Sequence, residues 1–309
     1  MMGGAAVARG SDGATAFVNP AGITRIPGES FSFSTFAVQM SSRTISNSLD
    51  PSGLLAIRDP DSLDLRVNIL PNTFCLFLDG PPKDDYSGKS RHKYGVCAAD
   101  AEKEEFFLSQ NKTGTPFAEL LTTNSLTTQM KFTRSSVAFS WGFQVLDTTS
   151  IGVTARIDNS RFEDQTTVTA AFVANTISAA EMATVTQSRS SSSWDSAITV
   201  GFTHNLSRIV TLGASLTTPS QHILGFHDGS EAQAPVDGEL KTLVQDKGDF
   251  RYNQPATLRL GLAFSWPTLN FEVNGNFYGA QNVLALAAFD RTTTSIHNGT
   301  LVDQQERKG

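Results

Sequence analysis

Two runs of alternating residues, joined by a short turn, most constrain what this chain can fold into. In the range 137–145 the odd positions carry Val, Phe, Trp, Phe and Val, whereas the even positions carry small or polar residues. After a turn at 147–149, the range 151–157 repeats the pattern with Ile, Val, Ala and Ile at the odd positions. Strict alternation of period two predicts strands with one apolar and one polar face, and the short turn predicts that they form a hairpin.

The polar face of this hairpin is unusually small and rich in hydroxyl groups, with Ser140, Gly142 and Thr154 among its members. In a soluble sandwich, the large apolar face would form the core. A small, hydroxyl-rich face opposite a large apolar face is instead typical of a barrel whose outside meets lipid and whose inside holds water or a ligand. The same unit recurs in four further ranges: 194–203, 210–216, 258–266 and 269–277. We therefore expect an all-β, antiparallel fold.

The connections between these runs alternate in length. Short turns at 147–149, 205–208 and 267–268 alternate with the long polar stretches 160–193 and 218–254. Bacterial outer-membrane barrels show this asymmetry, whereas soluble sandwiches have no reason for it. Trp266 at a short turn and Trp194 beside a long stretch also fit the aromatic girdles at the two membrane interfaces. These features favour a transmembrane β-barrel.

Composition agrees with a barrel and excludes other classes. Charged residues make up 17% of the 309 residues, below the roughly 25% of soluble domains. No stretch approaches the ~18 apolar residues of a membrane-spanning helix, whereas barrel strands need only about 9–11 residues each. A net charge of -6 and the lack of a basic, aromatic-rich patch argue against nucleic-acid binding.

Residues 1–29 are rich in Gly and Ala, which permit close packing of backbone on backbone, and include Asn19, Pro20, Ala21 and Gly22. These features alone are equally compatible with a flexible lead that contains a single turn. However, the order Gly-Gly-Ala, Val-Ala, an acidic residue, Ala-Phe-Val and then Asn-Pro-Ala-Gly resembles the mature N-terminus of the FadL/TodX-type outer-membrane transporters. The range 71–78 (Pro-Asn-Thr-Phe-Cys-Leu-Phe-Leu) is similar to the second-strand region of that family.

The resemblance implies a fourteen-stranded barrel that is plugged by an N-terminal hatch. It implies passive uptake of long-chain fatty acids or other hydrophobic compounds at the bacterial outer membrane, without a cofactor or a metal. The bend formed by Asn19, Pro20 and Ala21 would then be the gating element. We expect a hatch at 1–29, barrel strands with long extracellular loops at 30–279 and a loop-like end at 280–309. The expected partners are a hydrophobic small molecule and outer-membrane lipid, and we expect a monomer.

About nine strands can be counted, if the weak segment at 93–98 is included. Single-chain bacterial barrels have even numbers of strands. The first residues also lack the basic and apolar regions of a signal peptide. We therefore expect a fragment, or a miscalled gene, without its signal peptide and its last strands.

Three charged residues, Arg156, Arg259 and Glu272, fall on polar strand faces and are candidate lumen contacts. An arginine there could bind the carboxylate of a ligand. The alternative, which we prefer, is ion pairing inside the lumen that stabilises the barrel.

The two cysteines, Cys75 and Cys97, are candidates for a disulfide. If the turn after Leu78 is centred near Tyr86, the two residues lie opposite each other on neighbouring strands. Export to an oxidising compartment would then permit a disulfide. Two free, separated thiols are equally compatible with the sequence.

No catalytic motif occurs, so we do not expect an enzyme. His222, His227 and Asp228 share one stretch, but their spacing matches no common metal site, which favours surface histidines. The serine run 190–193 lacks an evident partner base and is interpreted as a solvated loop. Two alternatives to transport remain: a structural or scaffolding outer-membrane barrel, and a secreted all-β binding module.

Overall fold

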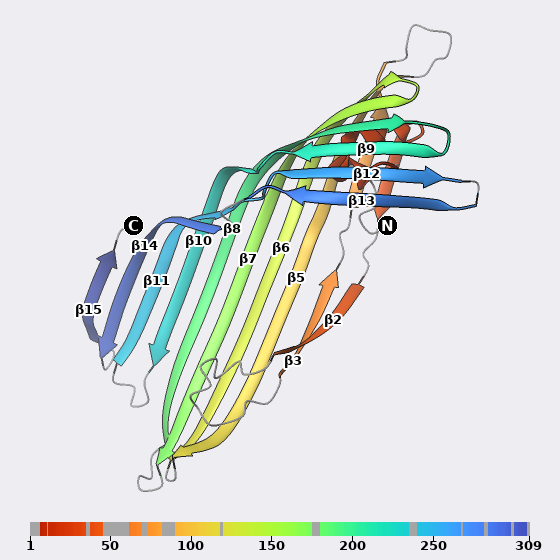
Figure 1. Ribbon diagram of the computed structural model, residues 1–309. Coiled ribbons are helices and arrows are strands. Elements are labelled where there is room, and N and C mark those ends of the chain that lie inside the picture. Colours follow the sequence, from red (N-terminus) through yellow and green to blue (C-terminus); the bar gives the residue numbers. More distant parts are fainter. Residues whose placement is uncertain are drawn as a thin grey trace.

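The protein is built almost entirely from antiparallel β-sheet (Figure 1). The computed structural model describes residues 7–10, 12–34, 38–45, 62–69, 73–81, 90–117, 120–174, 180–234, 240–266, 268–280, 284–297 and 300–307. The prediction of an all-β, antiparallel fold is confirmed.

Four long strands form the spine of the main sheet: β5 (His92–Phe117), β6 (Leu120–Leu146), β7 (Thr149–Ala174) and β8 (Ala180–Asn205). Two short strands continue the sheet from β5: β4 (Thr73–Asp79) and then β1 (Ser30–Ser34). A separate two-stranded sheet lies beside β5 and comprises β2 (Val38–Ile45) and β3 (Ser62–Ile69).

On the other side of the spine, the sheet divides at β8 into two arms. The upper arm contains β9 (Val210–Thr217), β12 (Thr257–Ser265) and β13 (Asn270–Tyr278). The lower arm contains β10 (Gln221–Ala234), β11 (Leu240–Tyr252), β14 (Leu284–His297) and β15 (Thr300–Arg307). In β8, the part Thr199–Asn205 pairs with β9, whereas the part Thr184–Ser196 pairs with β10.

Both arms keep the same chain order, because β9 leads into β10, β11 into β12, and β13 into β14. The fold is therefore an up-and-down meander whose last long segments are interrupted at one level of the sheet. Residues 218–220 and 253–256 form two of these interruptions, and the third follows Tyr278. Figure 1 shows the two arms leaving the spine in different directions as a result.

The sheet is open. We call the path that runs from β1 and β4 through the spine to β9, β12 and β13 the upper sheet. Within the described residues, its edges are β1 and β13. Eight antiparallel pairings separate these two strands, so they run in the same direction. The barrel and the hatch therefore stay predictions.

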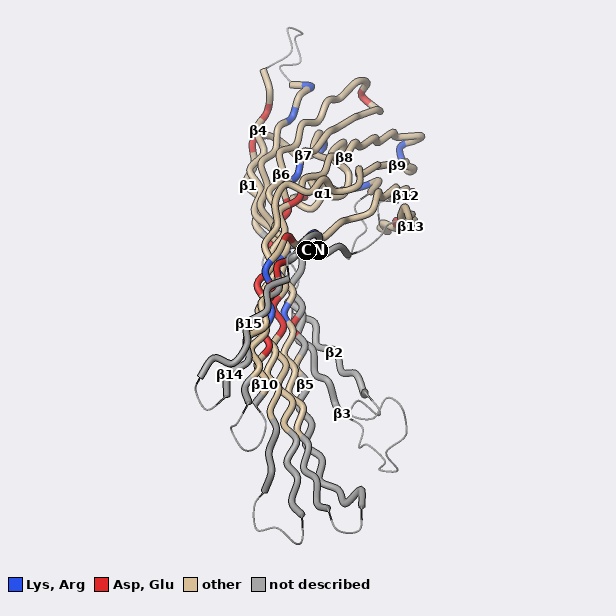
Figure 2. Tube along the Cα trace, turned by 90° about the vertical axis from the view of Figure 1, so that its left-hand side faces the viewer, with Lys and Arg blue, Asp and Glu red and all other residues tan. Residues whose placement is uncertain are grey.

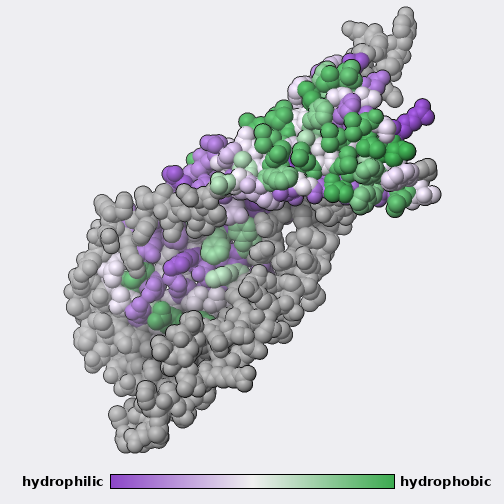
Figure 3. All heavy atoms as spheres, in the orientation of Figure 1, coloured by the Kyte–Doolittle hydropathy of each residue, from purple (hydrophilic) through white to green (hydrophobic). Residues whose placement is uncertain are grey.

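Burial along the strands is the reverse of that in a soluble protein. Phe139 is 54% exposed, whereas its neighbour Ala138 is completely buried. Ile198 is 49% exposed and the neighbouring Ala197 is 4% exposed. The large apolar side chains form what we call the apolar outer face, which includes Val137, Phe139, Ile151, Val153, Ile157, Trp194, Ile198, Val200, Phe202, Leu212, Leu216, Leu258 and Leu260. Figure 3 shows apolar side chains gathered over the upper part of the molecule.

The opposite, concave face of the upper sheet is covered by the N-terminal segment, defined here as residues 7–10 and 12–26. It contains the short helix α1 (Thr15–Val18) and the 3-10 helix η1 (Pro20–Arg25). Seen from the side, the upper sheet curves around α1 (Figure 2). A small apolar core, centred on Ile23, Phe77 and Ala138, lies between the segment and β4, β5 and β6. Among the described residues, no helix is long and apolar enough to cross a membrane.

The structure differs from the sequence prediction where long loops were expected. The ranges 160–193 and 218–254 consist mainly of paired strand, and β14 and β15 lie in the range 280–309 that was expected to be loop-like. Apolar residues in these ranges do not alternate regularly with polar ones, so the sequence gives no clear strand pattern, although Thr, which is frequent in 160–193, favours strands.

The strand count of about nine is also wrong. The described residues contain fifteen strands. These form ten extended segments when β1 is grouped with β2, β3 with β4, β9 with β10, β11 with β12, and β13 with β14. Nine of the segments contain the predicted strands, and the tenth is β15, whose polar sequence gave no strand signal.

Candidate functional site

The bend predicted as the gating element lies at the centre of the concave face. Asn19 is completely buried, and its side-chain Nδ2 donates hydrogen bonds to the carbonyls of Val7 and Phe202. Its Oδ1 accepts a hydrogen bond of 3.2 Å from the backbone of Ala21 at the start of η1. Pro20 sits at the first position of this helix, where its missing N–H costs nothing. One side chain thus holds the bend and attaches it to β8.

The sheet under this bend has no room for side chains. Gly152 and Gly201 lie opposite each other on β7 and β8. A Cβ atom on Gly152 would lie 2.4 Å from the carbonyl carbon of Pro20, and one on Gly201 would lie 2.1 Å from Asn19 Oδ1. Similar close approaches to the N-terminal segment occur at Gly142, Gly213 and Gly261. The glycines of the concave face therefore leave the space that the N-terminal segment occupies.

Hydroxyl groups of the same face bind the backbone of the segment. Thr154 Oγ1 donates to the Ala16 carbonyl at 2.8 Å, and Ser215 Oγ donates to the Val18 carbonyl at 2.7 Å. These contacts supply partners for polar backbone groups that would otherwise be buried without one. They give a physical reason for the hydroxyl-rich face recognised in the sequence.

Arg156, the first of the predicted lumen residues, lies in a buried ion pair. Its Nε donates to Asp158 Oδ2 at 2.9 Å, and its Nη2 donates to Gln254 Oε1 at 3.0 Å. Gln254 Nε2 in turn donates to Asp158 Oδ2 at 3.0 Å, and Ser136 also donates to Asp158. We call these four residues the Arg156 network. It lies where the two arms of the sheet separate, since Gln254 also exchanges hydrogen bonds with Ser220 between β9 and β10.

The other two predicted lumen residues lie apart from this network. Arg259 Nη1 donates to Thr217 Oγ1 at 3.1 Å, and Glu272 Oε1 accepts a hydrogen bond of 2.9 Å from the backbone of Ala8. Glu272 therefore anchors the N-terminal segment. The charges of Arg156, Arg259 and Arg134 are close enough to interact. These three arginines therefore lie near one another on the concave face; Arg134 was missed although it continues the polar face of the hairpin.

The two cysteines occupy opposite positions of β4 and β5. Cys75 Sγ and Cys97 Sγ are joined in a disulfide, with a sulfur–sulfur distance of 2.09 Å. Both residues are buried against the N-terminal segment, and a Cβ atom on Gly13 would lie 2.9 Å from Cys75 Sγ. The disulfide therefore belongs to the surface of the sheet on which the N-terminal segment packs.

The histidines were expected at the surface and the serines in a solvated loop, but the structure pairs one of each between β8 and β10. Ser191 Oγ lies 2.7 Å from His227 Nδ1, and both residues are buried. Burial lowers the pKa of His227, an effect that the nearby Asp246 partly opposes. The sequence could not show this pairing because it depends on the register between β8 and β10.

His222 bridges two carboxylates. Its Nδ1 lies 3.3 Å from Asp195 Oδ1, and its Nε2 lies 3.1 Å from Asp249 Oδ1. Ser193 Oγ donates to the other oxygen of Asp195 at 2.8 Å. Burial raises the pKa of Asp249, but hydrogen bonds from Arg251 and His222 outweigh it, so the net pKa is lowered. In the described part of the chain, no group of three or more His, Cys, Asp or Glu side chains is arranged to hold a metal ion.

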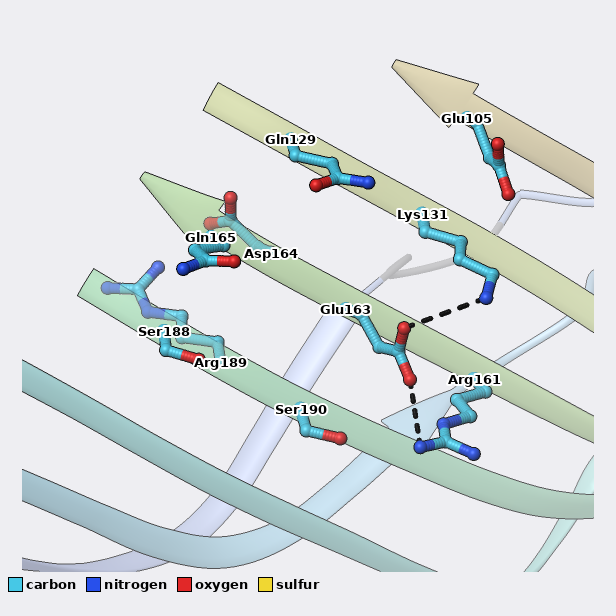
Figure 4. Close-up of a pocket in the computed structure, with 10 residues that line it drawn as sticks. All are labelled: Glu105, Gln129, Lys131, Arg161, Glu163, Asp164, Gln165, Ser188, Arg189 and Ser190. Carbon is cyan, nitrogen blue, oxygen red and sulfur yellow. Dashed lines mark ion pairs between the residues drawn. The ribbon is translucent and has the colours of Figure 1, made fainter. Parts of the chain in front are cut away.

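A separate charged pocket of about 460 Å³ lies on β5, β6, β7 and β8, beyond the apolar outer face (Figure 4). Its lining residues are all polar: Glu105, Gln129, Lys131, Arg161, Glu163, Asp164, Gln165, Ser188, Arg189 and Ser190. Arg161 Nη2 lies 2.8 Å from Glu163 Oε1, and Lys131 Nζ lies 3.9 Å from Glu163 Oε2. No sequence pattern indicated this pocket, since its residues come from four strands.

Comparison of the chain with protein-family models, with curated proteins and with solved structures found no match.

Proposed function

We propose that this protein is a plugged outer-membrane β-barrel that takes up long-chain fatty acids or other hydrophobic compounds passively. The observation that carries the proposal is the reversed burial, with large apolar side chains outside and small polar residues inside. Exposing such a face to water would leave a large apolar surface unburied, whereas lipid covers it at no such penalty. The sequence resemblance to the FadL/TodX-type transporters supplies the substrate class.

The dimensions of the apolar outer face support a membrane location. On β8 it extends from Trp194 to Phe202, or about 26 Å along the strand at ~3.3 Å per residue. With a tilt of ~40°, this length covers roughly 20 Å of membrane thickness, comparable with the ~25 Å apolar band of outer-membrane barrels. Trp194 lies at the end of this face, where an interfacial aromatic residue is favoured.

Closure of the sheet has one geometric requirement. Because β1 and β13 run in the same direction, an antiparallel barrel needs an odd number of further strands between them. The nine strands of the upper sheet and an odd number of additional strands give the even total that single-chain bacterial barrels have.

In the proposed function, the N-terminal segment is the hatch, and the concave face lines the path along which the hydrophobic compound passes through the barrel. An apolar chain would gain about 0.8 kcal/mol per buried CH₂ on entering the barrel. Arg156, Arg259 and Arg134 supply positive charge for an acid head group. Release of the bend at Asn19, Pro20 and Ala21 from Gly152 and Gly201 would open the route.

Reconstitution into phospholipid vesicles that enclose a fluorescent fatty-acid reporter tests this proposal. We expect saturable oleate entry that depends on the protein, and faster entry when residues 7–26 are deleted. Empty vesicles give the background, and a water-soluble anionic dye reports non-specific leakage. Insertion without oleate entry would overturn transport, and a stable monomer in buffer without detergent would overturn the membrane location.

A structural barrel without transport is the second candidate. The Arg156 network favours it, because Arg156 is already paired with Asp158 and Gln254 rather than exposed to a ligand. The vesicle experiment separates the two candidates, since only the transporter carries oleate.

A further inference from the structure

The end of β11 leaves β10 and lies over the concave face. β11 pairs with β10 only as far as Gly248, and its register with β14 shifts at the same point. We call the residues that follow, 249–254, the strap. A Cβ atom on Gly225 of β10 would collide with the Phe250 carbonyl oxygen. The strap therefore lies directly on β10 rather than beside it.

The strap also reaches three further strands. The ring of Tyr252 lies 5.4 Å from that of Phe132 on β6, and its backbone N–H donates to Ser193 Oγ on β8 at 3.3 Å. Gln254 binds Asp158 of β7 within the Arg156 network. Because β10, β8 and β7 separate β11 from β6, four strand spacings of ~4.8 Å would keep the two rings about 19 Å apart along a flat sheet. The strap therefore crosses the concave face.

His222 of β10 joins the strap to β8. Its Nδ1 lies 3.3 Å from both Asp195 Oδ1 and Ser193 Oγ, and its Nε2 lies 3.1 Å from Asp249 Oδ1. Ser193 gives its own proton to Asp195 Oδ2, so both atoms that face Nδ1 are acceptors and Nδ1 carries a proton. The contact between Nε2 and Asp249 then needs a second proton, which a charged imidazolium supplies.

We propose that the strap is a proton-controlled closure of the concave face, held by protonated His222 and released when the ring loses its charge. Deprotonation leaves a lone pair on Nε2 opposite a carboxylate oxygen, so two acceptors face each other without a proton. Asp195 is completely buried, whereas the side chain of Asp249 is 32% exposed, so Asp249 is the partner that can move. Control of the path of the hydrophobic compound rests on the proposed function, whereas release of the strap does not.

The charged groups around His222 come from three strands. Asp195 of β8 and Asp249 of β11 contact the ring directly. Arg251 of β11 binds the other oxygen of Asp249 at 3.0 Å. Asp158 of β7 lies opposite Asp195 in the register and is neutralised within the Arg156 network. The ring thus faces two carboxylates, and a single positive charge on it serves both.

Hydrogen exchange of the full chain in detergent micelles, followed by mass spectrometry, tests release of the strap. After correction for the intrinsic pH dependence of exchange, we expect protection of the strap amides to fall about tenfold from about pH 5.5 to about pH 8.5, as for loss of one charge-assisted hydrogen bond. The amides of 152–157 on β7 report whether the sheet is intact. The buried, neutral His227 would act in the opposite direction, because acid destabilises it. Protection of the strap that stays constant over this pH range would overturn the proposal.

Two variants separate the parts of the contact. In Asp249→Asn, the new amide group can accept from a protonated Nε2 or donate to a neutral one, so the strap should stay protected at both pH values. His222→Gln removes the group that changes charge, so protection should be low and equal at both. His204→Gln, at the other end of β8, is the matched control and should keep the tenfold fall. A tenfold fall that persists in either of the first two variants would contradict the assignment. Because Asp249 is partly exposed, its variant keeps the test decisive if His222→Gln does not fold.

Oleate entry into vesicles separates this proposal from the proposed function. We expect entry to be faster at the higher pH in the wild type than in Asp249→Asn at the same pH, a comparison that cancels the change in charge of oleate itself. Release of the strap without oleate entry at either pH would remove transport and leave the strap. Oleate entry with constant protection of the strap would remove the strap and leave transport.

Discussion

The side chain of Asn19 donates a hydrogen bond of 3.0 Å to the backbone carbonyl of Phe202, which lies 183 positions later in the chain. The same amide group donates to the Val7 carbonyl, and Oδ1 accepts from the backbone of Ala21. One buried residue therefore connects the bend, the start of the N-terminal segment and β8.

Replacing Asn19 by Ala should release the N-terminal segment. Three backbone groups would lose their partner in a buried site, at a cost of about 1–3 kcal/mol each where the group stays buried. We expect faster trypsin cleavage after Arg25, whose side chain is now bound to the Ala8 carbonyl and Asn205. Asn276→Ala, at an exposed asparagine, is the control. Equal cleavage rates in the two variants would contradict the assigned role.

Gly152→Ala should have the same effect without removing a hydrogen-bonding group. The new methyl group would lie 2.4 Å from the Pro20 carbonyl carbon, and overpacking of this kind costs about 1–3 kcal/mol. At Gly275 the nearest atom to an added Cβ is a Phe277 ring carbon at 3.4 Å, so Gly275→Ala should leave the segment protected. Trypsin cleavage and melting temperature in detergent measure both variants.

The Cys75–Cys97 disulfide should stabilise the folded protein. The cysteines are 22 residues apart, and a loop of this size is expected to contribute roughly 3 kcal/mol, mainly by restricting the unfolded chain. We expect a reductant to lower the melting temperature of the native protein but not that of the Cys75→Ser/Cys97→Ser variant. Two free thiols, titrated in denaturant without reductant, would show that the disulfide is absent.

The Arg156 network should show strong coupling between its two charges. Asp158→Asn leaves a buried guanidinium without its counter-charge, which typically costs about 3–5 kcal/mol. The double variant Arg156→Met/Asp158→Asn removes the unpaired charge and should be more stable than Asp158→Asn alone. Denaturant unfolding of the four members of this cycle measures the coupling. Additive effects would show that the two residues act independently.

His227 should make the protein less stable in mild acid. Burial lowers its pKa, so between the usual value of about 6.5 and the lowered value the unfolded chain binds a proton that the folded chain does not. The free energy of unfolding should therefore fall as the pH drops below about 6.5. Asp246, Asp228 and Arg189 also act on this ring, and the net effect is still a lowered pKa. The fall should be shallower in His227→Gln, as melting curves between pH 7.5 and 5 would measure. An unchanged slope would contradict a buried, neutral imidazole.

Strands were predicted most accurately from the sequence where one face of the strand is apolar and the other is small and polar. The hairpin around 147–149 is confirmed, and in its register Val137 pairs with Ile157 and Gly142 with Gly152. Alternation is visible there because one face contacts the N-terminal segment and the other carries large apolar groups. The opposed positions of Cys75 and Cys97 agree with the register of β4 and β5, whereas the turn predicted near Tyr86 lies outside the described residues.

The parts that could not be predicted depend on contacts between distant strands. β10 and β11 contain apolar residues without a sustained alternation, so no periodicity distinguishes these strands from a loop. The Arg156 network needs Gln254, which follows β11 and lies 98 positions from Arg156. Likewise, the pairing of Ser191 with His227 exists only in the register of β8 with β10.

The interruptions at 218–220 and 253–256 have a consequence for how this fold can vary. They separate the register of the lower arm from that of the upper arm, so residues added to the hairpin of β10 and β11 leave β9 and β12 in place. Side chains alternate every two residues, and insertions in pairs therefore preserve both faces. The lower arm can lengthen in steps of roughly 6.6 Å, while the upper sheet keeps a constant height.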